Sequence, residues 1–554
     1  MVAWCVYIGR KWRAFIPILK MPRVPPSKSA VLAAVGSNPL GVQPIGNALL
    51  TCGFAKRETD LGLFRAFDDE FLIYFLTNYL DGKSVACLGA TSRTFYALAS
   101  DPNLWRDHYI SDIGSRLDHW AGSWRGTYAA ACGSRNDDAV QCLVSARGVY
   151  SDVLYQAFLT AAFEPRDFLE HHTSREYARL RARRKGDAVE HPQITDNMPR
   201  IMASADTEEF INNYAMQSHP CIITGEMDEW PCRAWSLDEM VRRWPKREFQ
   251  AEAIRINSLN YCKYARSAGG GGSADTRGVV PDTSPFYLFD AELAAGEPDA
   301  AAEWRVPETL RRIPGHDDQD SRTRADLFSL FGSLRPDYRW LIAGPARSGS
   351  GWHKDPNMTS AWNAVVVGSK YWMMLPPDTP PPGVYVSEDE SEVAAPASIS
   401  EWMMDFYAET KRRHGRRELG GSGKLLECVC LAGEVMYVPS GWWHLVVNLD
   451  ECVALTQNFV STVELPRVLE FMKYKPDQIS GFKPEAPPPE SLFDEFCARL
   501  EKYDPQLLQD ALCHVKRRGP KALPTQDWRE RLCGDQNEPF SLGAEGDDLG
   551  EVPW

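Results

Sequence analysis

The chain has 554 residues, more than one compact core usually supports, so we expect several folded units. Its hydrophobic fraction of 44% is typical of a globular protein and argues against a mainly disordered chain. The formal net charge of −14 argues against a general surface for gripping nucleic acid, although it leaves room for a local basic patch. The sequence contains no run of about 18 uncharged apolar residues, so we expect no membrane-spanning helix.

Residues 1–58 form the first segment. No Asp or Glu occurs before Glu58, while basic residues recur between Arg10 and Lys28. We expect a disordered basic extension, or a start codon placed ahead of the true one, for which Met21 is available. The pattern also overlaps that of organelle transit peptides, so organelle targeting stays open as an alternative.

The 14 cysteines are scattered along the chain and form no Cys-x-x-Cys pair. Cys428 and Cys430 stand at strand spacing, which places both side chains on one face. This usage predicts buried free thiols rather than a disulfide framework or a zinc site. It indicates a reducing compartment, so we expect the nucleus or the cytoplasm as the location.

Residues 59–112 predict a small helical domain. Asp68 and Asp69 are suited to start a helix, and apolar residues recur at helical spacing in AFDDEFLIYFLTNYL. Shorter helices follow in VACLGATSRTFYALAS and in the segment that begins NLWR. This order resembles an F-box, which implies that residues 61–110 bind a Skp-type adaptor of a ubiquitin ligase. The alternative is an ordinary three-helix subdomain, and loss of adaptor binding in Leu72→Asp would favour the F-box.

The rest of the chain divides into three parts by composition. Residues 113–195 predict a helical linker, in which the basic run REYARLRARRKG is interpreted as a solvated helix face. Residues 196–465 are rich in β-patterns, and the glycines 269–272 within them lack the context of a phosphate-binding loop. Residues 466–554 predict a helical extension that ends in an acidic disordered tail.

The stretch SGSGWHKDP contains two candidate metal ligands. Side chains at positions i and i+2 of a strand project to the same face, so His353 and Asp355 can offer an imidazole and a carboxylate to one point. The third ligand should come from a neighbouring strand, and GEVMYVPSGWWHLVVNL supplies His444 at the start of one. Two histidines and one carboxylate with open coordination positions are typical of non-haem Fe(II) oxygenases. No thiol lies in these motifs, which disfavours a closed zinc site.

Two further side chains are suited to hold the distal carboxylate of 2-oxoglutarate. Gly368-Ser369 predicts a two-residue hairpin turn, after which Lys370 begins an antiparallel strand and can point inward. A second hairpin is expected around residues 448–451, and its returning strand CVALTQNF includes Thr456. A lysine ammonium and a threonine hydroxyl directed at one carboxylate would bind it strongly.

These segments together resemble the Jumonji-C oxygenases, most closely the branch of the lysyl hydroxylase and arginine demethylase once described as a phosphatidylserine receptor. The similarity covers about residues 199–465 and is carried by YRWLIAGPARSGSGWH, DPNMTSAWNAVVVGSKYWMMLPP and VPSGWWHLVVNLDECVALTQNF. The resemblance implies an α+β fold: a double-stranded β-helix of the cupin (jelly-roll) type, with an N-terminal three-helix F-box-like domain and a C-terminal helical segment.

The same resemblance implies roles for individual residues. The implied iron ligands and catalytic residues are His353, Asp355 and His444. The residues that match contacts to 2-oxoglutarate are Lys370, Thr456, Asn363 and Ser350, the last where the family has a hydroxylated residue. Tyr261 matches a tyrosine that binds the co-substrate; neighbouring Tyr264 is the alternative, and either can instead be a core residue.

An insert over residues 378–432 separates the two halves of the motif set. It holds the acidic run SEDESE and the basic run KRRHGRRE, and we expect two solvated loops flanking a helix near residues 402–410. Substrate choice can be governed there, so the resemblance says little about the substrate.

The implied function is an Fe(II)- and 2-oxoglutarate-dependent dioxygenase that uses O₂ to hydroxylate a protein side chain containing Lys or Arg. Lysyl hydroxylation is favoured by the resemblance, while demethylation of N-methyl arginine or lysine, including that of histones, shares the mechanism and stays open. Other classes are a catalytically silent binding module, an F-box substrate receptor that uses the Jumonji-C domain to recognise a target, and, more remotely, a metal hydrolase.

Overall fold

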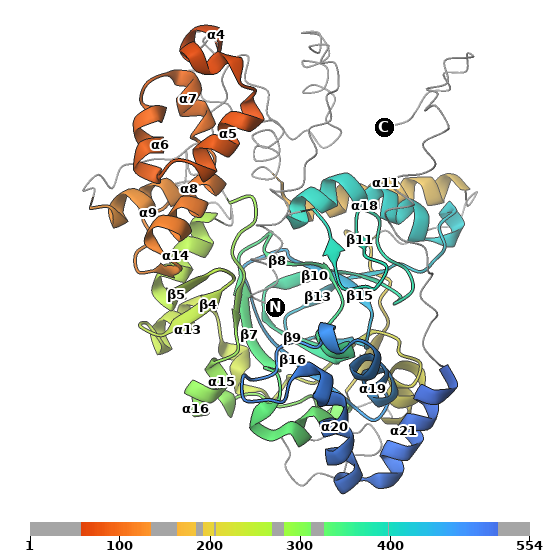
Figure 1. The fold of residues 1–554 in the computed structure, drawn as a ribbon. Helices are drawn as coiled ribbons and strands as arrows, with labels where there is room; N and C mark the ends of the chain where they lie inside the picture. Colours follow the sequence, from red (N-terminus) through yellow and green to blue (C-terminus); the bar gives the residue numbers. More distant parts are fainter. Residues whose placement is uncertain are drawn as a thin grey trace, which may run out of the picture.

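The computed structural model describes residues 57–133, 163–183, 192–203, 207–268, 282–311, 326–396 and 398–518. Most of the expected basic extension, the glycines 269–272 and the expected acidic tail lie outside these residues. Figure 1 shows β-sheets in the middle of the molecule, one group of helices formed by the first described helices of the chain and another formed by the last.

Two sheets build the central body. The larger is mixed and has the strand order β1-β5-β4-β6-β7-β16-β9-β14-β3-β2, and the smaller is antiparallel with the order β13-β10-β15-β8. The strands of the large sheet are, in that order, Arg116–Leu117, Ile254–Asn257, Glu248–Ala251, Leu288–Asp290, Arg339–Gly344, Cys452–Phe459, Ser360–Val367, Val435–Val438, Cys221–Thr224 and Arg200–Met202. Those of the small sheet are Leu426–Leu431, Ser369–Leu375, Trp443–Asn448 and Gly349–His353. A separate two-stranded hairpin, β11 (Tyr385–Val386) with β12 (Val393–Ala394), lies in the insert.

From β7 to β10, and again from β13 to β16, consecutive strands alternate between the two sheets, which confirms the predicted double-stranded β-helix. β9 pairs with β14 and β16 in the large sheet, whereas β10, which follows it directly, pairs with β13 and β15 in the small sheet. The two hairpins predicted at Gly368-Ser369 and at residues 448–451 are therefore wrong, because both are crossovers between sheets. The crossovers touch: a Cβ added at Gly368, whose φ is +81°, would lie 2.4 Å from the carbonyl oxygen of Glu451. Only glycine fits there.

Strand alternation gives each sheet an inner and an outer face. On β10, Trp372 and Met374 pack between the sheets, while Tyr371, Met373 and Leu375 pack on the outer face of the small sheet. Cys428 and Cys430 share the inner face as predicted, and both are buried free thiols. The interior of the barrel is therefore lined by alternate residues of the strands that carry the motifs.

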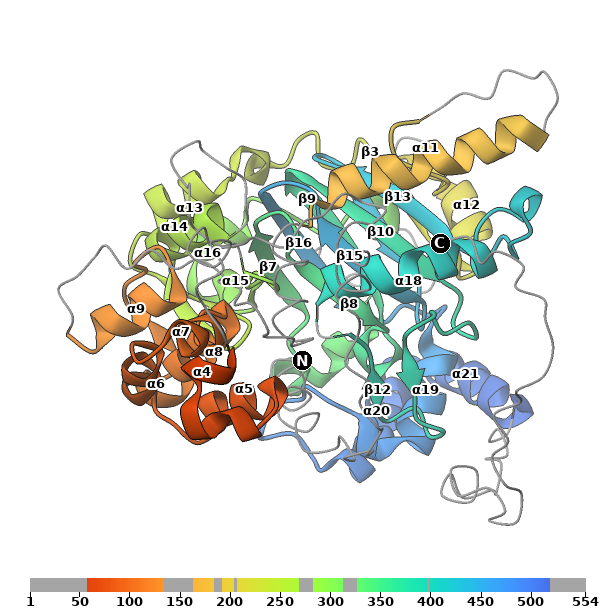
Figure 2. The ribbon, with the colours of Figure 1, turned by 90° about the horizontal axis from the view of Figure 1, so that it is seen from above.

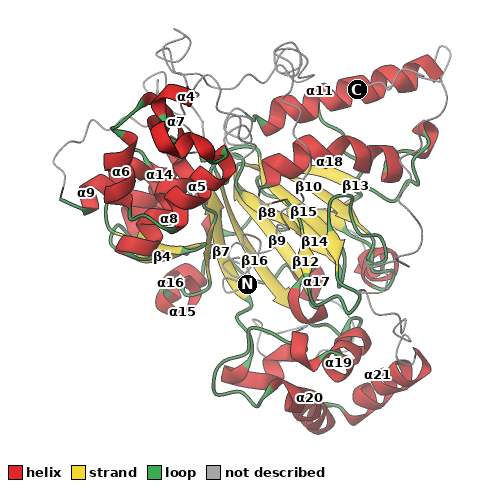
Figure 3. Ribbon diagram, turned by 45° about the horizontal axis from the view of Figure 1, so that its top comes forward, coloured by secondary structure: helices red, strands yellow, loops and turns green. Residues whose placement is uncertain are grey.

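Two helices cover the outer face of the small sheet. These are α11 (Pro165–Arg183) and α18 (Ile399–His414), which Figures 2 and 3 show side by side across the strands. Phe168, Trp402 and Tyr407 from these helices join the core of that face. The helix expected near residues 402–410 is thus part of a covering layer, and the 113–195 region contributes its partner.

Most of the remaining helices pack on the large sheet and at the C-terminal end, while η8 contacts α11. Those before the barrel motifs are α12 (Thr207–Phe210), η4 (Ile211–Ala215), η5 (Pro231–Ala234), α13 (Leu237–Arg243), α14 (Ser258–Ala268), α15 (Leu293–Gly296), α16 (Pro298–Ala301), α17 (Glu308–Arg311) and η6 (Leu327–Leu334). Those between the barrel strands are η7 (Pro356–Met358) and η8 (Arg417–Leu419), and those after them are α19 (Leu465–Tyr474), η9 (Pro476–Gln478), α20 (Pro489–Tyr503) and α21 (Pro505–Arg518). None of the helices in the described ranges has the length and apolar character that crossing a membrane requires.

The N-terminal helices form the predicted small helical domain. They are α4 (Arg57–Asp60), η2 (Gly62–Ala66), α5 (Asp69–Asn78), α6 (Gly82–Gly89), α7 (Arg93–Leu98), α8 (Pro102–His108), η3 (Tyr109–Ile113) and α9 (Trp124–Ala131). The carboxylate of Asp68 caps α5 by accepting the backbone N–H of Phe71, which confirms the predicted helix start.

This helical domain shares one hydrophobic core with the large sheet. The core runs without a break from Leu72 through Trp105 and Trp124 to strands β5, β7 and β9. The indole N–H of Trp124 donates to Asp282 at 2.8 Å, and that of Trp120 donates to Ser267 at 2.8 Å. Strand β1 also pairs with β5 of the sheet. The start of the region that we expected to be a linker is therefore a packed junction.

Candidate metal and co-substrate site

Two neighbouring strands bring the predicted histidines together. His353 ends β8 and stands opposite His444 on β15, and the ring centroids are 4.1 Å apart. Asp355 follows the strand with extended backbone angles before η7 begins, so the i, i+2 spacing still holds. One ligand atom from each of His353, Asp355 and His444 lies within 4.8 Å of the others.

Backbone hydrogen bonds fix which nitrogen of each histidine is free. Nδ1 of His353 lies 2.7 Å from the carbonyl oxygen of Gly351, and Nδ1 of His444 lies 3.1 Å from that of Trp442. A carbonyl can only accept, so each Nδ1 carries the proton and each Nε2 keeps its lone pair. Hydrogen bonds of this kind orient histidines that ligate metals.

Burial shifts the pKa of two of the three groups, His444 and Asp355. Burial, together with the neighbouring charge of His353, lowers the pKa of His444 well below its ordinary value, so the ring is neutral. Burial also raises the pKa of Asp355, against favourable interactions with His353 and Asn458. Oδ2 of Asp355 is shielded from solvent and has no hydrogen-bond partner. A buried carboxylate oxygen without a partner beside two imidazoles fits Fe(II), which takes this donor set with open positions.

Lys370 points into the barrel, deep between the sheets. Its ammonium is buried and donates to the hydroxyl of Tyr287 at 2.6 Å and to Oδ1 of Asn448 at 2.9 Å. Burial alone would lower its pKa, but neighbours that include Cys452 and Tyr287 leave the pKa raised, so the amine stays charged. Nδ2 of Asn448 donates in turn to Ser348, which holds the amide in place. A fixed buried cation of this kind suits a carboxylate.

Thr456 and Asn363 lie opposite each other on β16 and β9. The hydroxyl of Thr456 donates to the carbonyl oxygen of Trp362 at 2.8 Å, while Oδ1 of Asn363 is buried and has no hydrogen-bond partner. The inner face of β16 runs from Cys452, beside Lys370, to Asn458, beside Asp355. Thr456 therefore lies along the line that joins the buried cation to the metal ligands.

Of the other residues predicted to contact 2-oxoglutarate, Ser350 lies on a strand of the site, whereas Tyr261 and Tyr264 lie outside it. Ser350 is on β8 and pairs with Val446, and the bulge that follows in β8 brings Ser350 to the same side as His353. Tyr261 is not brought to the site, because its hydroxyl donates to the backbone carbonyls of Phe286 and Ala343 in the core outside the barrel. The hydroxyl of Tyr264 donates to Asp282 at 2.6 Å in the same outer core.

Tyr287 occupies the place that the sequence analysis gave to Tyr261. It packs with Ile342 and Ala454 on the inner side of the large sheet, where its hydroxyl contacts Lys370. The signal that could have found it is the strand pattern of PFYLFD, in which Tyr287 alternates with outward-facing Phe286. The sequence analysis did not identify Asn448 as a site residue, because it placed Asn448 in the turn expected around residues 448–451.

Comparison with known proteins gives the same family. A cupin-like domain model matches residues 207–464, and an F-box-like model matches residues 69–111. The arginine-specific demethylase JMJ22 of Arabidopsis thaliana is 35% identical over 86% of this chain and 84% of its own length. The bifunctional arginine demethylase and lysyl-hydroxylase psr-1 of Caenorhabditis briggsae is 28% identical over 54% of this chain and 73% of its own length. The human 2-oxoglutarate and iron-dependent oxygenase JMJD4 is 31% identical over 25% of this chain and 30% of its own length.

The fold and the facial set of two histidines and one carboxylate define an oxygenase of the cupin class. The chain belongs to the Jumonji-C family of cupin-like oxygenases and carries an F-box-like domain ahead of the barrel. It is an enzyme whose cofactors are Fe(II) and the co-substrates 2-oxoglutarate and O₂.

Asn448→Ala should weaken the binding of 2-oxoglutarate about tenfold, because Lys370 would lose the amide oxygen that orients it. The rate at saturating 2-oxoglutarate should change little, since the ammonium itself remains. A titration of succinate formation against 2-oxoglutarate measures both quantities. Asn260→Ala removes another buried amide, at the junction, and should leave the titration unchanged. Equal effects of the two variants would show that Asn448 acts only through general stability.

Proposed function

We propose that the enzyme oxidises a C–H bond on a basic side chain of a protein substrate. Hydroxylation of a lysyl carbon is the first expectation, and demethylation of N-methyl arginine or lysine is the second. The two reactions differ only in the carbon that is presented to the metal, since hydroxylation of an N-methyl carbon releases formaldehyde. The names of JMJ22 and psr-1 include both kinds of activity for those proteins.

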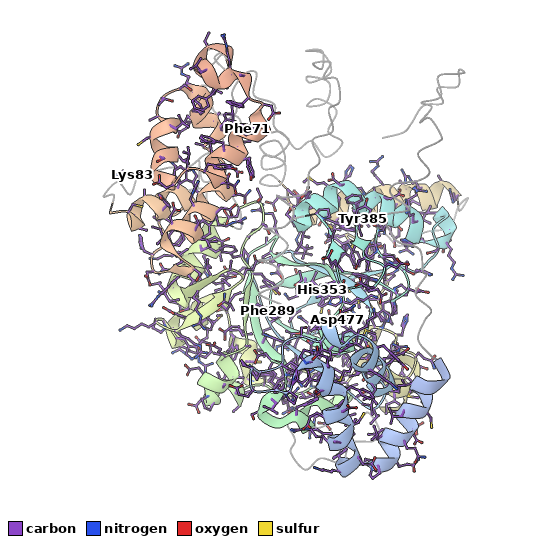
Figure 4. The ribbon with its side chains drawn as sticks, viewed as in Figure 1. Phe71, Lys83, Phe289, His353, Tyr385 and Asp477 are labelled. Carbon is purple, nitrogen blue, oxygen red and sulfur yellow. The ribbon has the colours of Figure 1, made fainter. Side chains whose placement is uncertain are left out.

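An acidic hairpin beside the metal ligands supports a basic substrate. Lys354 follows His353 directly, and its ammonium lies 4.0 Å from Glu390 between strands β11 and β12. Lys475 and Gln478 both donate to the backbone carbonyl of Asp389, which ties the same loop to the end of α19 and to η9. In the view of Figure 4, His353 lies between Tyr385 of the hairpin and Asp477 of η9.

The exposed side chains of this region are mainly acidic. Lys354 and Lys475 form ion pairs with Glu390. Other carboxylates of the region face solvent, namely Glu388, Asp389, Glu392 and Asp477. Exposed charge of one sign near a site raises the local concentration of oppositely charged ligands. The single observation that carries the proposal is therefore this acidic hairpin, held next to the strand that bears the metal ligands.

The residues of the barrel divide the work of catalysis. Iron and 2-oxoglutarate, when bound, supply the oxidative chemistry that turns O₂ and the keto acid into succinate, CO₂ and a hydroxylated carbon. His353, Asp355 and His444 would hold the metal through Nε2 and carboxylate oxygens. Lys370 would hold the distal carboxylate of the keto acid, with Tyr287 beside it. Trp372, whose ring stacks on His444, helps to keep water from the inner wall.

Mass spectrometry of peptides incubated with the enzyme, Fe(II) and 2-oxoglutarate tests the proposal. Peptides that contain lysine, methyl-lysine or methyl-arginine, including histone tails, should gain one oxygen or lose a methyl group. A Glu388→Gln/Glu392→Gln variant should raise KM for a basic peptide several-fold and leave peptide-independent succinate formation unchanged. Glu490→Gln/Glu501→Gln, which removes the same charge from exposed positions on α20, is the control. Modification of neutral peptides in preference to basic ones would contradict the proposal.

A second function is supported by an exposed aromatic row on the F-box-like domain. Phe67 and Phe71 stack at 4.6 Å, Phe71 and Phe75 stack at 6.5 Å, and Leu63, on the preceding η2, is 93% exposed. Apolar surface of this kind on a soluble domain marks a protein contact. We propose that this face binds a Skp-type adaptor and that the enzyme acts within, or is delivered to, a ubiquitin ligase.

Because Leu72 is buried, a variant other than Leu72→Asp is needed to test adaptor binding. Leu72 is fully buried, so Leu72→Asp would unfold the helical domain whether or not it binds an adaptor. Phe71→Asp changes a side chain that is 43% exposed and should abolish capture of a purified Skp-type adaptor while the domain stays folded. Tyr385→Asp, on the distant hairpin, should leave capture intact. Undiminished binding by Phe71→Asp would remove this face from the interaction.

A further inference from the structure

Two basic segments that are far apart in the sequence meet on the layer that covers the small sheet. One is the second half of α11, and the other is the end of α18 together with η8. Arg183 donates to the backbone carbonyl of Glu418, and Arg416 donates to Glu176 and Tyr177 at 2.9 Å each. The exposed arginines of these segments, which we call the basic face, are Arg175, Arg179, Arg181, Arg183, Arg412, Arg413 and Arg417.

The positive charge of the basic face is only partly neutralised. The carboxylates beneath it are occupied, since Lys411 pairs with the buried Glu176 and Glu427. At the surface, Glu409 is shared by Arg412 and Arg413. Within the described ranges no hydrogen bond or ion pair engages Arg175, Arg179 or Arg181. The face therefore keeps an excess of positive charge on a chain whose net charge is −14.

The pKa of a histidine beneath the face agrees with this field. His172 packs against Phe168 and Tyr407. Its pKa is lowered to about 4 by burial, and then by the positive charges of His171, Arg175, Lys411 and Arg179. Side chains from α11 and α18 thus act on the same point, which is expected only where the two basic segments form one surface.

We propose that the basic face binds the phosphate backbone of duplex DNA. Arginine presents a planar fork of donors that suits phosphate oxygens, and the free positive charges here are arginines. Arg175, Arg179 and Arg183 follow one another at one-turn steps of about 6 Å along a 19-residue helix, which forms a rigid row. Such a row suits a regular array of charges.

The face lacks the features that a single strand requires. Single-stranded nucleic acids are bound largely by stacking of bases on exposed aromatic side chains. None of the exposed large hydrophobic side chains of the described chain lies within residues 163–183 or 398–424. Contacts from this face would thus be limited to the backbone, where a duplex carries its charge most densely.

Binding at the basic face would not obstruct the metal site. α11 and α18 cover the outer face of the small sheet, while His444 and Lys370 lie on the inner side. DNA and a peptide substrate can therefore be bound at the same time. Because the peptide enters elsewhere, occupation of the face should leave oxidation of a free peptide unchanged, and this separates the inference from the proposed function.

Fluorescence anisotropy of a labelled DNA duplex, titrated with the full-length enzyme over a range of KCl concentrations, tests the inference. Arg175→Gln/Arg179→Gln/Arg412→Gln should weaken binding roughly tenfold or more and reduce the slope of log affinity against log salt by about 2 to 3. The control Lys83→Gln/Arg116→Gln/Arg242→Gln removes the same charge from exposed positions elsewhere and should change neither quantity.

Three results would overturn the inference. The first is no saturable binding of the duplex at low salt. The second is an equal loss in the two triple variants, which would assign binding to net charge alone. The third is tighter binding of single-stranded RNA, or of poly-glutamate as an acidic polypeptide, than of the duplex, which would assign the face to another partner.

Discussion

Asp355→Ala should abolish Fe(II) binding, and succinate formation should fall by roughly a hundredfold or more, since even the loss of a group that merely orients a metal ligand costs up to that much. Oδ2 of Asp355 is buried without a partner, and the Nε2 atoms of both histidines are left free by backbone bonds. The carboxylate supplies the only negative charge among the three ligands. Without it, only the two imidazoles remain, and they hold the metal weakly.

The measurement combines metal titration with thermal unfolding. Wild-type protein should be stabilised by Fe(II) or by Co(II) as a substitute, and the variant should lose this metal-dependent shift. The metal-free variant should be no less stable than metal-free wild type, because the burial that opposes the charged carboxylate outweighs its interactions with His353 and Asn458. Asp337→Ala, which breaks an exposed pair with Lys483, is the control. Normal turnover in Asp355→Ala would refute the metal assignment.

The same carboxyl group gives the enzyme a pH dependence. Only the deprotonated carboxylate binds metal, and burial raises the pKa of Asp355 above its ordinary value. Fe(II) affinity should therefore fall on acidification at a higher pH than an exposed aspartate would require. The Co(II) titration, repeated across pH, measures this.

Lys370→Met should raise the apparent Kd for 2-oxoglutarate by at least about 30-fold, equivalent to about 2 kcal/mol, the lower end of the cost of removing one partner of a buried charge pair. Methionine keeps most of the volume and removes the charge, so the packing around Tyr287 and Cys452 should be maintained. The loss should appear in the 2-oxoglutarate titration and not in the metal titration.

A variant that separates charge from shape completes this test. Lys370→Arg keeps a cation but replaces the compact ammonium that fits between Tyr287 and Asn448. It should bind 2-oxoglutarate with an affinity between those of wild type and Lys370→Met. Wild-type affinity in Lys370→Met would remove the lysine from the co-substrate site.

Local patterns were sufficient to predict the three candidate metal ligands that the structure brings together, whereas the fold class was predicted from the family resemblance. The spacing of His353 and Asp355 needs only an extended backbone, and His444 needs only a strand beside it. The inward side of Lys370 was also predicted, although for a wrong reason. A Gly-Ser pair is compatible with a hairpin and with a crossover, and the choice depends on which distant strands pair with β9 and β10.

Features that depend on distant contacts were not accessible from the sequence. Tyr261 and Tyr287 both precede the motif set, and only the packing of α14 outside the barrel shows that Tyr261 is engaged with backbone carbonyls. The basic runs on α11 and α18 were each interpreted as an isolated solvated surface. Their meeting depends on both helices covering the same sheet, which no local pattern encodes.

The continuous core between the helical domain and the large sheet makes the two parts one cooperative unit. An enzyme cut after α9 would lose the cover of Trp124 and Trp120 and leave Asp282 with fewer of its buried donors. Expression of the barrel alone should therefore give an aggregating product. An adaptor bound to the aromatic row would therefore hold the catalytic pocket in a fixed orientation, because no flexible linker separates the helical domain from the barrel.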